Sequence, residues 1–252
     1  MRNMKHKDIT RLKNYKPTTP SLRSRVIPDL SYLDHLLPEK TLKVPTKNQS
    51  GRNYTGTITC RHKGQRHKRA LRYIDFNRYQ KPKYILSYEY DPNRTALIAR
   101  CFDQNFKPFY TIAPDHIQKT TVEQPFTLQL KDITPGTTIY NVGPFSRSAG
   151  SSAVLLNIDG KNATIRLPSK KNYTLSSDTY ASIGKTSNKT HKLRKQGKAG
   201  ANRWLGIRPT VRGYAMNPCD HPNGGKTHGG PQPKTKWGKW AKWVSTRKNN
   251  KK

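Results

Sequence analysis

The stretch "SAVLLNIDGKNATIRLP", residues 152–168, decides the fold of this chain. It contains two short runs of β-branched and aliphatic residues on either side of the turn sequence Asp159–Asn162. Asp-Gly suits the positive-φ positions of a tight hairpin turn, so we predict antiparallel strands over residues 152–158 and 163–168. Similar runs and turn signals recur on both sides at the close spacing of small β barrels or sandwiches.

The middle of the chain contains two sets of such runs. The first set has five, at residues 54–60, 71–76, 83–90, 95–102 and 109–113. The second set has six, at residues 125–130, 137–142, 152–158, 163–168, 173–176 and 180–184. Between two runs of the first set, "DPNR" at 91–94 is a turn in which Pro92 fixes φ. We predict a mainly β protein with two barrels in tandem, an OB-fold and then an SH3-like barrel.

The two ends of the chain differ in composition from its middle. The 252 residues carry 49 Lys and Arg against 14 Asp and Glu, a net charge of +35. Residues 179–252 hold 18 Lys and Arg against one acid, Asp220. After Gly184 the hydrophobic pattern has no period, and such a segment cannot bury enough apolar area to offset its ordering entropy. We expect this segment to be extended and to become ordered on a partner.

These differences divide the chain into four parts. We expect a basic N-terminal extension at residues 1–50, an OB-fold domain at 51–118, an SH3-like barrel at 119–190 and an extended basic tail at 191–252. The division follows the charge, because nine of the fourteen acids lie between residues 71 and 178.

The net charge predicts a polyanionic partner, since a compact isolated domain tolerates such self-repulsion poorly. No run approaches the roughly 18 apolar residues of a membrane-spanning helix, and no basic stretch has an apolar helical face. We therefore expect a nucleic acid and no membrane. Cys60, Cys101 and Cys219 form neither a CxxC pair nor an even set, which indicates a reducing compartment and no zinc site. No cofactor is expected, apart from Mg²⁺ ions that could bridge the tail to phosphates.

The first basic motif is "CRHKGQRHKRALR", residues 60–72, which we expect in the loop between the first two strands. On an OB-fold this loop borders the usual oligonucleotide face. A solvated charged loop is the alternative, but six cations without an acid repel one another unless something binds. The two histidines have no Cys or acid nearby, so we expect them to contact phosphates or to stack rather than to bind metal. The candidate residues are Arg61, His62, Lys63, Arg66, His67, Lys68, Arg69 and Arg72.

The second motif is "GKAGANRWLGIRPTVRGYAMNPCDHPNGG", residues 197–225. Its glycines let the backbone approach a surface closely or adopt positive φ. Its cationic side chains offer donors to phosphates. These are Lys198, Arg203, Arg208 and Arg212. Trp204 could stack on an unpaired base or anchor the tail against the core of the second barrel, and both alternatives remain open.

Both motifs resemble the universal large-subunit ribosomal protein L-two family. Residues 197–225 are similar to its Gly-Arg-Ala-Gly, Arg-Trp-Leu-Gly, Arg-Pro-x-Val-Arg-Gly and Met-Asn-Pro-x-Asp-His-Pro series. Further similar stretches follow in the family's order, so that the resemblance covers most of residues 15–240. They lie at residues 15–21, 51–76, 89–99, 135–142, 147–156 and 166–169.

The resemblance implies an OB-fold followed by an SH3-like barrel, with both tails threaded into large-subunit rRNA. It implies a ribonucleoprotein of translation that binds rRNA early, lies among other ribosomal proteins, and supports tRNA binding and association with the small subunit. It also implies a loop near the peptidyl transferase region. By their place in the family's series, the residues of that loop are Met216, Asn217, Asp220, His221, Pro222 and Asn223.

Several positions depart from the family's pattern. Gln65 and Arg66 replace two glycines of a triplet, the stretch "GPFS" at 143–146 is short, and Asn223 stands where the family has a second histidine. Together with the Asn-, Lys- and Tyr-rich composition, these departures indicate an organellar, mitochondrial member, with a plastid or the bacterial cytoplasm as alternatives. The resemblance starts at Tyr15 after a short leader, so we expect synthesis inside the organelle.

Two other functions compete with that of a structural rRNA-binding protein. A nucleic-acid enzyme would use Asp220 and His221 as an acid/base pair, but adjacent side chains commonly point apart and no third group is available to position the imidazole. A free-standing single-strand binder of OB type would need a groove rather than threaded arms. We therefore expect no enzyme. We expect the Asp220 carboxylate to accept hydrogen bonds that hold its loop, and His221 to be presented to RNA.

Overall fold

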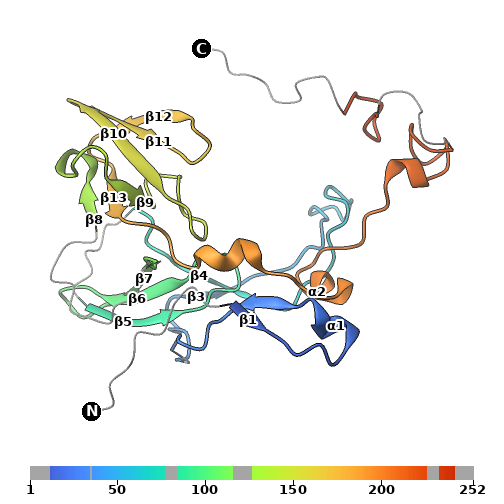
Figure 1. The fold of residues 1–252 in the computed structure, drawn as a ribbon, viewed down its shortest axis with the longest axis horizontal. Helices are drawn as coiled ribbons and strands as arrows, with labels where there is room; N and C mark the ends of the chain where they lie inside the picture. Colours follow the sequence, from blue (N-terminus) through green and yellow to red (C-terminus); the bar gives the residue numbers. More distant parts are fainter. Residues whose placement is uncertain (1–11, 35, 78–83, 116–126, 226–232, 242–252) are drawn as a thin grey trace. The chain divides into compact units, whose positions relative to one another are not determined.

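The computed structural model describes five parts of the chain, which fall into two compact units (Figure 1). The described residues are 12–34, 36–77, 84–115, 127–225 and 233–241. The first unit comprises residues 1–48 and 67–205, and the second comprises residues 49–66 and 206–252. Most of the basic leader and the last eleven residues of the tail lie outside the described residues.

The hairpin predicted from residues 152–168 is confirmed. Strand β10 (Ala153–Asp159) pairs with β11 (Asn162–Arg166) in antiparallel register, and Asp159 lies opposite Asn162. Gly160 has a φ of 56° in the turn, as the Asp-Gly sequence requires. Figure 1 shows β10, β11 and β12 next to one another in the second barrel.

The second barrel is one six-stranded sheet in the order β12-β11-β10-β9-β13-β8. Its remaining strands are β8 (Thr127–Gln129), β9 (Thr138–Tyr140), β12 (Asn172–Ser176) and β13 (Tyr180–Ile183). A short 3-10 helix η1 (Leu130–Asp132) follows β8. The inward positions of these strands form one buried apolar cluster, because side chains alternate between the two faces of a strand. The cluster includes Leu130, Ile139, Leu155 and Ile165.

The first barrel has a separate core. Strands β5 (Tyr84–Glu89), β6 (Ile98–Phe102) and β7 (Pro108–Ile112) form an antiparallel sheet in sequence order. Their buried side chains include Tyr88, Ala99, Cys101 and Phe109, and Leu97, directly before β6, joins the same cluster. The fold is therefore mainly β, an OB-fold barrel followed by an SH3-like barrel, with basic tails.

The N-terminal part of the chain adds elements that the hydrophobic pattern missed. Strand β1 (Leu12–Asn14) pairs with β2 (Val26–Pro28), and helix α1 (Pro20–Arg23) lies between them. Thr19 followed by Pro20 at the first helical position was a usable signal for this helix. A third short strand, β3 (Lys43–Pro45), pairs with β4 (Ala70–Arg72).

The strand predicted at residues 54–60 is wrong. This run folds back on itself, with a single bridge between Arg52 and Ile58, and Tyr54 is 95% exposed. Its apolar residues have no core to face, so the β-branched composition does not produce a strand. The basic loop therefore begins after β3 and ends at β4. The strand predicted at 71–76 is shorter than expected, although Ile74 forms a further bridge to Tyr110.

The segment after Gly184 is not extended throughout. It contains a 3-10 helix η2 (Lys189–Leu193), helix α2 (Ala199–Trp204) and a 3-10 turn η3 (Gly213–Ala215). Lys195 and Val26 exchange both backbone hydrogen bonds, at 2.8 and 3.1 Å. Backbone pairing with β2 thus orders a segment that has little apolar surface of its own.

The two barrels share a contact within the first unit. The Ser187 hydroxyl accepts a hydrogen bond from the Leu97 backbone N–H at 3.0 Å, and the Asn188 amide donates to the Thr95 carbonyl at 2.8 Å. A small buried cluster of Ala96, Ile112 and Tyr140 draws on both barrels. These hydrogen bonds and the shared cluster join the two barrels within the first unit.

Candidate nucleic-acid interface

The two basic motifs are brought together by backbone pairing in the second unit. The Gly64 N–H donates to the Gly206 carbonyl at 2.8 Å, and the Arg208 N–H donates to the His62 carbonyl at 2.9 Å. Lys63 and Ile207 form the antiparallel bridge between these bonds. Two segments that lie far apart in the sequence thus form one short ladder.

The close approach of these segments requires glycine at position 206. Gly206 has a φ of 85°, and a Cβ there would lie 3.1 Å from both the Gly64 carbonyl oxygen and the Arg66 Cβ. Any other residue would meet both strain from the positive φ and crowding. The glycine of the second motif is therefore needed where the two loops meet.

The chain before the first motif is also folded tightly. The Gly51 carbonyl accepts hydrogen bonds from the N–H groups of Thr59 and Cys60, at 2.9 and 3.0 Å. Gly51 has a φ of 79°, and a Cβ there would collide with the Cys60 carbonyl oxygen. This turn places Arg52 and Ile58 beside the basic loop.

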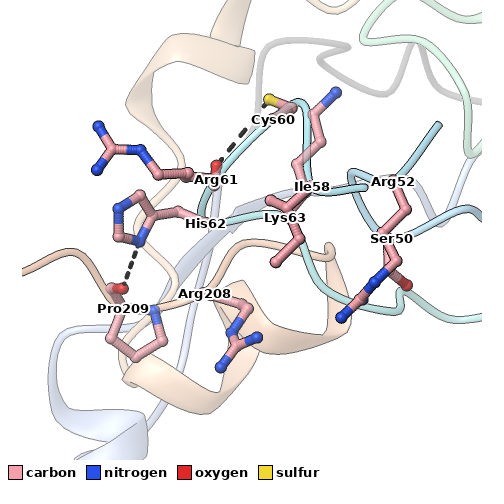
Figure 2. A pocket seen from close by; sticks show the side chains of 9 residues that line it. All are labelled: Ser50, Arg52, Ile58, Cys60, Arg61, His62, Lys63, Arg208 and Pro209. Atoms are coloured by element: carbon pink, nitrogen blue, oxygen red, sulfur yellow. Dashed lines mark hydrogen bonds between the residues drawn. The ribbon is translucent and has the colours of Figure 1, made fainter. Parts of the chain in front are cut away.

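These segments enclose a cavity of about 260 Å³. Figure 2 shows His62 and Pro209 on one side of it, Arg52 on the other, and Lys63 and Ile58 between them. The lining carries four cationic side chains and no acid, so its potential is positive. The lining residues are Ser50, Arg52, Ile58, Cys60, Arg61, His62, Lys63, Arg208 and Pro209.

His62 is held in one tautomer at the edge of the cavity. Its Nδ1 lies 2.9 Å from the Pro209 carbonyl oxygen. A carbonyl oxygen can only accept, so Nδ1 carries the proton. In the neutral imidazole, Nε2 then remains as a hydrogen-bond acceptor.

The later residues of the first motif lie in the first unit, and two of them bond to residues of the first barrel. Arg69 donates to the Pro92 carbonyl at 2.7 Å. Arg72 forms a 3.3 Å ion pair with the fully buried Asp91, and its own side chain is only 10% exposed. The His67 N–H donates to the Trp204 carbonyl. The first motif therefore has two parts. The part up to Arg66 lies in the second unit and contributes to the cavity, and the later part lies in the first unit and leads into β4. Lys68 is exposed.

Helix α2 carries the aromatic residue of the second motif. Trp204 is 59% exposed, so it is not a core anchor. The Lys198 ammonium lies 4.8 Å from the centroid of its ring, close enough for a cation–π contact. A second cavity, of about 120 Å³, lies beside Trp204 and includes Arg25 and Arg194 in its lining. Arg203 is exposed on the same helix.

The loop at residues 216–225 is held by backbone bonds and by two side chains. The His221 Nδ1 accepts a hydrogen bond from the Asn223 N–H at 3.1 Å, so its proton lies on Nε2. Gly213 packs against this imidazole, where a Cβ would lie only 2.5 Å from the ring. The Asp220 N–H donates to the Asn217 carbonyl at 3.0 Å. The role expected for the Asp220 carboxylate stays a prediction.

Asn223 connects this loop to the tail. Its amide donates to the Lys234 carbonyl and accepts from the Lys234 N–H, both at 3.1 Å, and the residue is 6% exposed. Lys234 in turn bridges to Trp240 in a small hairpin whose turn carries Trp237. The Arg61 guanidinium lies 5.1 Å from the centroid of the Trp237 ring.

Five residues of the cavity lining were not among the predicted candidates: Ser50, Arg52, Ile58, Cys60 and Pro209. Pro209 stands beside Arg208 in the second motif, and Arg52 follows the glycine that opens the turn, so proximity in sequence was the available signal. Ile58 was assigned to a strand. The remaining candidates, Arg212, Met216 and Pro222, lie in the loops of the second unit.

The described residues contain no group of three or more His, Cys, Asp or Glu side chains that could hold a metal ion. They also contain no helix that is long and apolar enough to cross a membrane. Cys60 and Cys219 are exposed free thiols, and Cys101 is buried. Mg²⁺ ions shared with phosphates stay a prediction.

Two β barrels, together with loops that carry many cations and few acids, are typical of a nucleic-acid-binding protein. Comparison with known families is more specific. Residues 39–122 match the family model described as Ribosomal Proteins L2, RNA binding N-terminal domain. Residues 125–241 match Ribosomal Proteins L2, C-terminal domain.

Curated relatives match nearly the whole chain. The large ribosomal subunit protein uL2 of Ehrlichia ruminantium is 44% identical, with 95% of each chain covered. The uL2 protein of Akkermansia muciniphila is 39% identical, with 90% of each chain covered. This chain belongs to the ribosomal protein L2 family. It is a structural constituent of the large ribosomal subunit that binds rRNA, and it is not an enzyme.

Proposed function

We propose that the loops of the second unit form the principal rRNA contact of this protein. Its described residues carry nine Lys and Arg against one acid, Asp220. Such a surface releases counterions when it neutralises phosphates, and this release drives binding to RNA. The pairing of residues 62–64 with 206–208 supports the proposal, because it concentrates cations from both motifs on one small unit.

The contact set that we propose includes both motifs, from Arg61 to Lys68 and from Lys198 to Arg212. The contact set also includes Arg69 and Arg72. We expect these two to contribute less to RNA binding, because both already bond to groups of the first barrel. Trp204 contributes an exposed ring on which an unpaired base can stack.

We further propose that the loop from Met216 to Asn223 lies near the peptidyl transferase region and supports tRNA binding, and that the protein aids association with the small subunit. The support is the match to the family's Met-Asn-Pro-x-Asp-His-Pro series. The loop is suited to such a place because hydrogen bonds and packing on Gly213 hold His221 in a defined orientation.

We also propose a mitochondrial ribosome as the location. The Asn-, Lys- and Tyr-rich composition and the departures at Gln65, Arg66 and Asn223 support it. Mass spectrometry of ribosomes purified separately from mitochondria, plastids and cytoplasm tests this placement. Recovery of the chain in a plastid or bacterial ribosome instead would exclude it.

Sedimentation at low and high salt tests the rRNA contact itself. We expect the chain to co-migrate with a large-subunit particle that survives moderate salt. A free-standing RNA-binding protein would leave the particle, because it lacks the neighbouring ribosomal proteins and the threaded tails that hold a subunit constituent in place in addition to its phosphate contacts.

Charge reversal in the basic loop gives a sharper test. We expect the double variant Arg66→Glu, Lys68→Glu to stop large-subunit assembly early, since two acids would repel the phosphates that the loop binds. The same change at Lys170 and Lys171, which are exposed in the turn after β11, serves as the control. Normal incorporation of the loop variant, measured by quantitative mass spectrometry of particles, would contradict the assignment.

A further inference from the structure

We propose that the cavity between the two basic loops binds a single unpaired nucleotide of large-subunit rRNA. This inference rests on the proposed rRNA contact and specifies its chemistry. The base would enter against Ile58 and Pro209, and its phosphates would lie at the guanidinium and ammonium groups around the opening.

The size of the cavity limits the ligand to about one nucleotide. Its volume is about 260 Å³, just below the roughly 300–1,000 Å³ of pockets that bury drug-sized molecules. Neither an oligonucleotide nor a duplex fits such a space. An unpaired nucleotide that has been turned out of its helix does fit, and this is the form in which proteins commonly read RNA bases.

The lining is suited to both parts of a nucleotide. Ile58 and Pro209, with the aliphatic stems of the long cationic side chains, offer apolar surface to a base. Arg52, Lys63 and Arg208 offer donors to phosphate oxygens. A plain electrostatic surface would need only the charges, so the apolar wall is the feature that points to a base.

His62 adds a polar group of defined direction. Because its Nδ1 proton is used by the Pro209 carbonyl, Nε2 of the neutral ring is left to accept from a ribose 2′-hydroxyl or from a base N–H. A ribonucleotide supplies both a ring for the apolar wall and a donor for Nε2.

The walls are fixed before any ligand binds. One wall is held by the two hydrogen bonds to the Gly51 carbonyl, and the other by the ladder between residues 62–64 and 206–208. A preformed cavity reduces the ordering cost of binding.

Filling the cavity without changing its charge tests the proposal. Ile58 and Cys60 line it, whereas Thr59 between them does not, as expected for side chains that alternate along an extended segment. Ile58→Trp therefore places an indole in the cavity, and Thr59→Trp places the same group outside it. Both positions are exposed, so neither change disturbs a core. Thr59→Trp removes the 3.3 Å bond from the Thr59 hydroxyl to the Gly51 carbonyl, but the two bonds from the backbone N–H groups to that carbonyl remain.

The dissociation constant of the full chain for large-subunit rRNA is measured by filter binding at one fixed salt concentration. We expect Ile58→Trp to weaken binding at least tenfold and Thr59→Trp to stay within twofold of the wild type. Equal binding by the wild type and Ile58→Trp would refute the nucleotide site and leave the proposed rRNA contact unaffected. Failure of the wild type to bind this rRNA would instead overturn the proposed function.

Alkylation of Cys60 gives a second measurement that needs no variant. This exposed thiol lies in the lining, and a small reagent such as iodoacetamide reaches it in the free chain. We expect large-subunit rRNA to slow its alkylation at least tenfold, followed by mass spectrometry of the Cys60 peptide. An unchanged rate in the bound state would show that the cavity stays open and would refute the proposal.

Discussion

At the scale of single residues, two arginines of the first basic motif, Arg69 and Arg72, bond to groups of the first barrel and help to hold it together. Asp91 is fully buried and accepts hydrogen bonds from Arg72, from Arg94 and from the Asn93 N–H. A buried carboxylate is stable only with such partners. Arg72 is therefore a structural residue as much as a candidate RNA contact, which its place in a basic run did not reveal.

We expect Asp91→Ala to lower the free energy of unfolding by about 3 kcal/mol, since it leaves two guanidinium groups without their buried partner. Urea denaturation of the full chain, followed by tyrosine fluorescence, measures the loss. The control is Asp178→Ala, which breaks the exposed ion pair to Lys131 and should cost less than about 1 kcal/mol. Equal losses in the two variants would contradict the argument.

A second buried group in the same barrel is built around Glu89. Its carboxylate accepts from the Tyr110 hydroxyl at 3.0 Å and pairs with Arg100 at 2.5 Å. Burial is the largest cause that raises the pKa of Tyr110 above its ordinary value. The phenol therefore keeps its proton throughout the neutral range and remains a donor to Glu89.

At the scale of the element, the two loops of the cavity depend on glycines whose environments differ. Gly51 and Gly56 both have positive φ, 79° and 82°. A Cβ at Gly51 would collide with the Cys60 carbonyl, whereas a Cβ at Gly56 would meet nothing within 4 Å. Replacing each glycine by alanine therefore distinguishes the cost of backbone strain, which both variants carry, from the cost of crowding, which only the Gly51 variant carries.

We expect Gly56→Ala to cost about 1 kcal/mol through the left-handed conformation alone. Gly51→Ala should cost more and should also open the turn, because the backbone of Cys60 must move. Hydrogen exchange at the Thr59 and Cys60 amides is the measurement, with faster exchange expected only in Gly51→Ala. Slow exchange at both amides in that variant would show that the turn does not need the close approach.

The hairpin at residues 233–241 depends on Asn223. We expect Asn223→Ala to release this hairpin, because it leaves the Lys234 N–H and carbonyl without their partners, at a cost of about 1–3 kcal/mol. Trypsin cleavage after Lys234 and Lys236 should become at least several-fold faster. Asn202→Ala, an exposed change in helix α2, should leave the cleavage rate as in the wild type.

At the scale of the whole molecule, the packed barrels and the cation-rich loops of the cavity lie in different units. The two barrels share a buried cluster and lie in one unit. Nine of the fourteen acids lie between residues 71 and 178, within the part of the chain that contains the barrels. The second unit has cations on short loops and little core. This division explains how a chain with a net charge of +35 keeps a folded part, since most of the acids that offset the cations lie in the part of the chain that contains the barrels.

We expect the affinity of the full chain for large-subunit rRNA to fall by about 10³ to 10⁵ between 50 and 200 mM salt, as for a protein that makes 6–10 phosphate contacts. Filter binding across this range gives the slope of log affinity against log salt. A nearly flat slope would mean that phosphates contribute little, and it would exclude the electrostatic part of the proposal.

Much of the fold was predictable because strands leave a local signal. The β-branched and aliphatic run at residues 152–158 and the Asp-Gly turn predict the central hairpin correctly, and the strands around it lie within a few residues of their expected positions. The run at 54–60 is also rich in β-branched residues but has no sheet to join, so no strand forms there. The short helices α1 and α2 depend on capping and tertiary support, which periodicity does not report.

The candidate site was predictable as a list of residues and not as an arrangement. Charge counting and motif similarity identify Arg61 to Lys63 and Arg208 separately, because basic composition is a property of the sequence itself. That these segments pair, enclose a cavity and fix the His62 tautomer depends on hydrogen bonds between distant residues. Likewise, only the buried position of Asp91 decides that Arg72 has a partner inside the protein.

The sequence alone determined the class of fold, the basic character of the ends and the family, since periodicity, charge and motif order are local or additive properties. Only the tertiary structure decided which basic residues line one cavity, which support the barrel, and how Asn223 connects the loop to the tail. The physical reason is that these outcomes depend on which polar groups of distant residues form hydrogen bonds with each other, and only the folding of the chain brings those groups together.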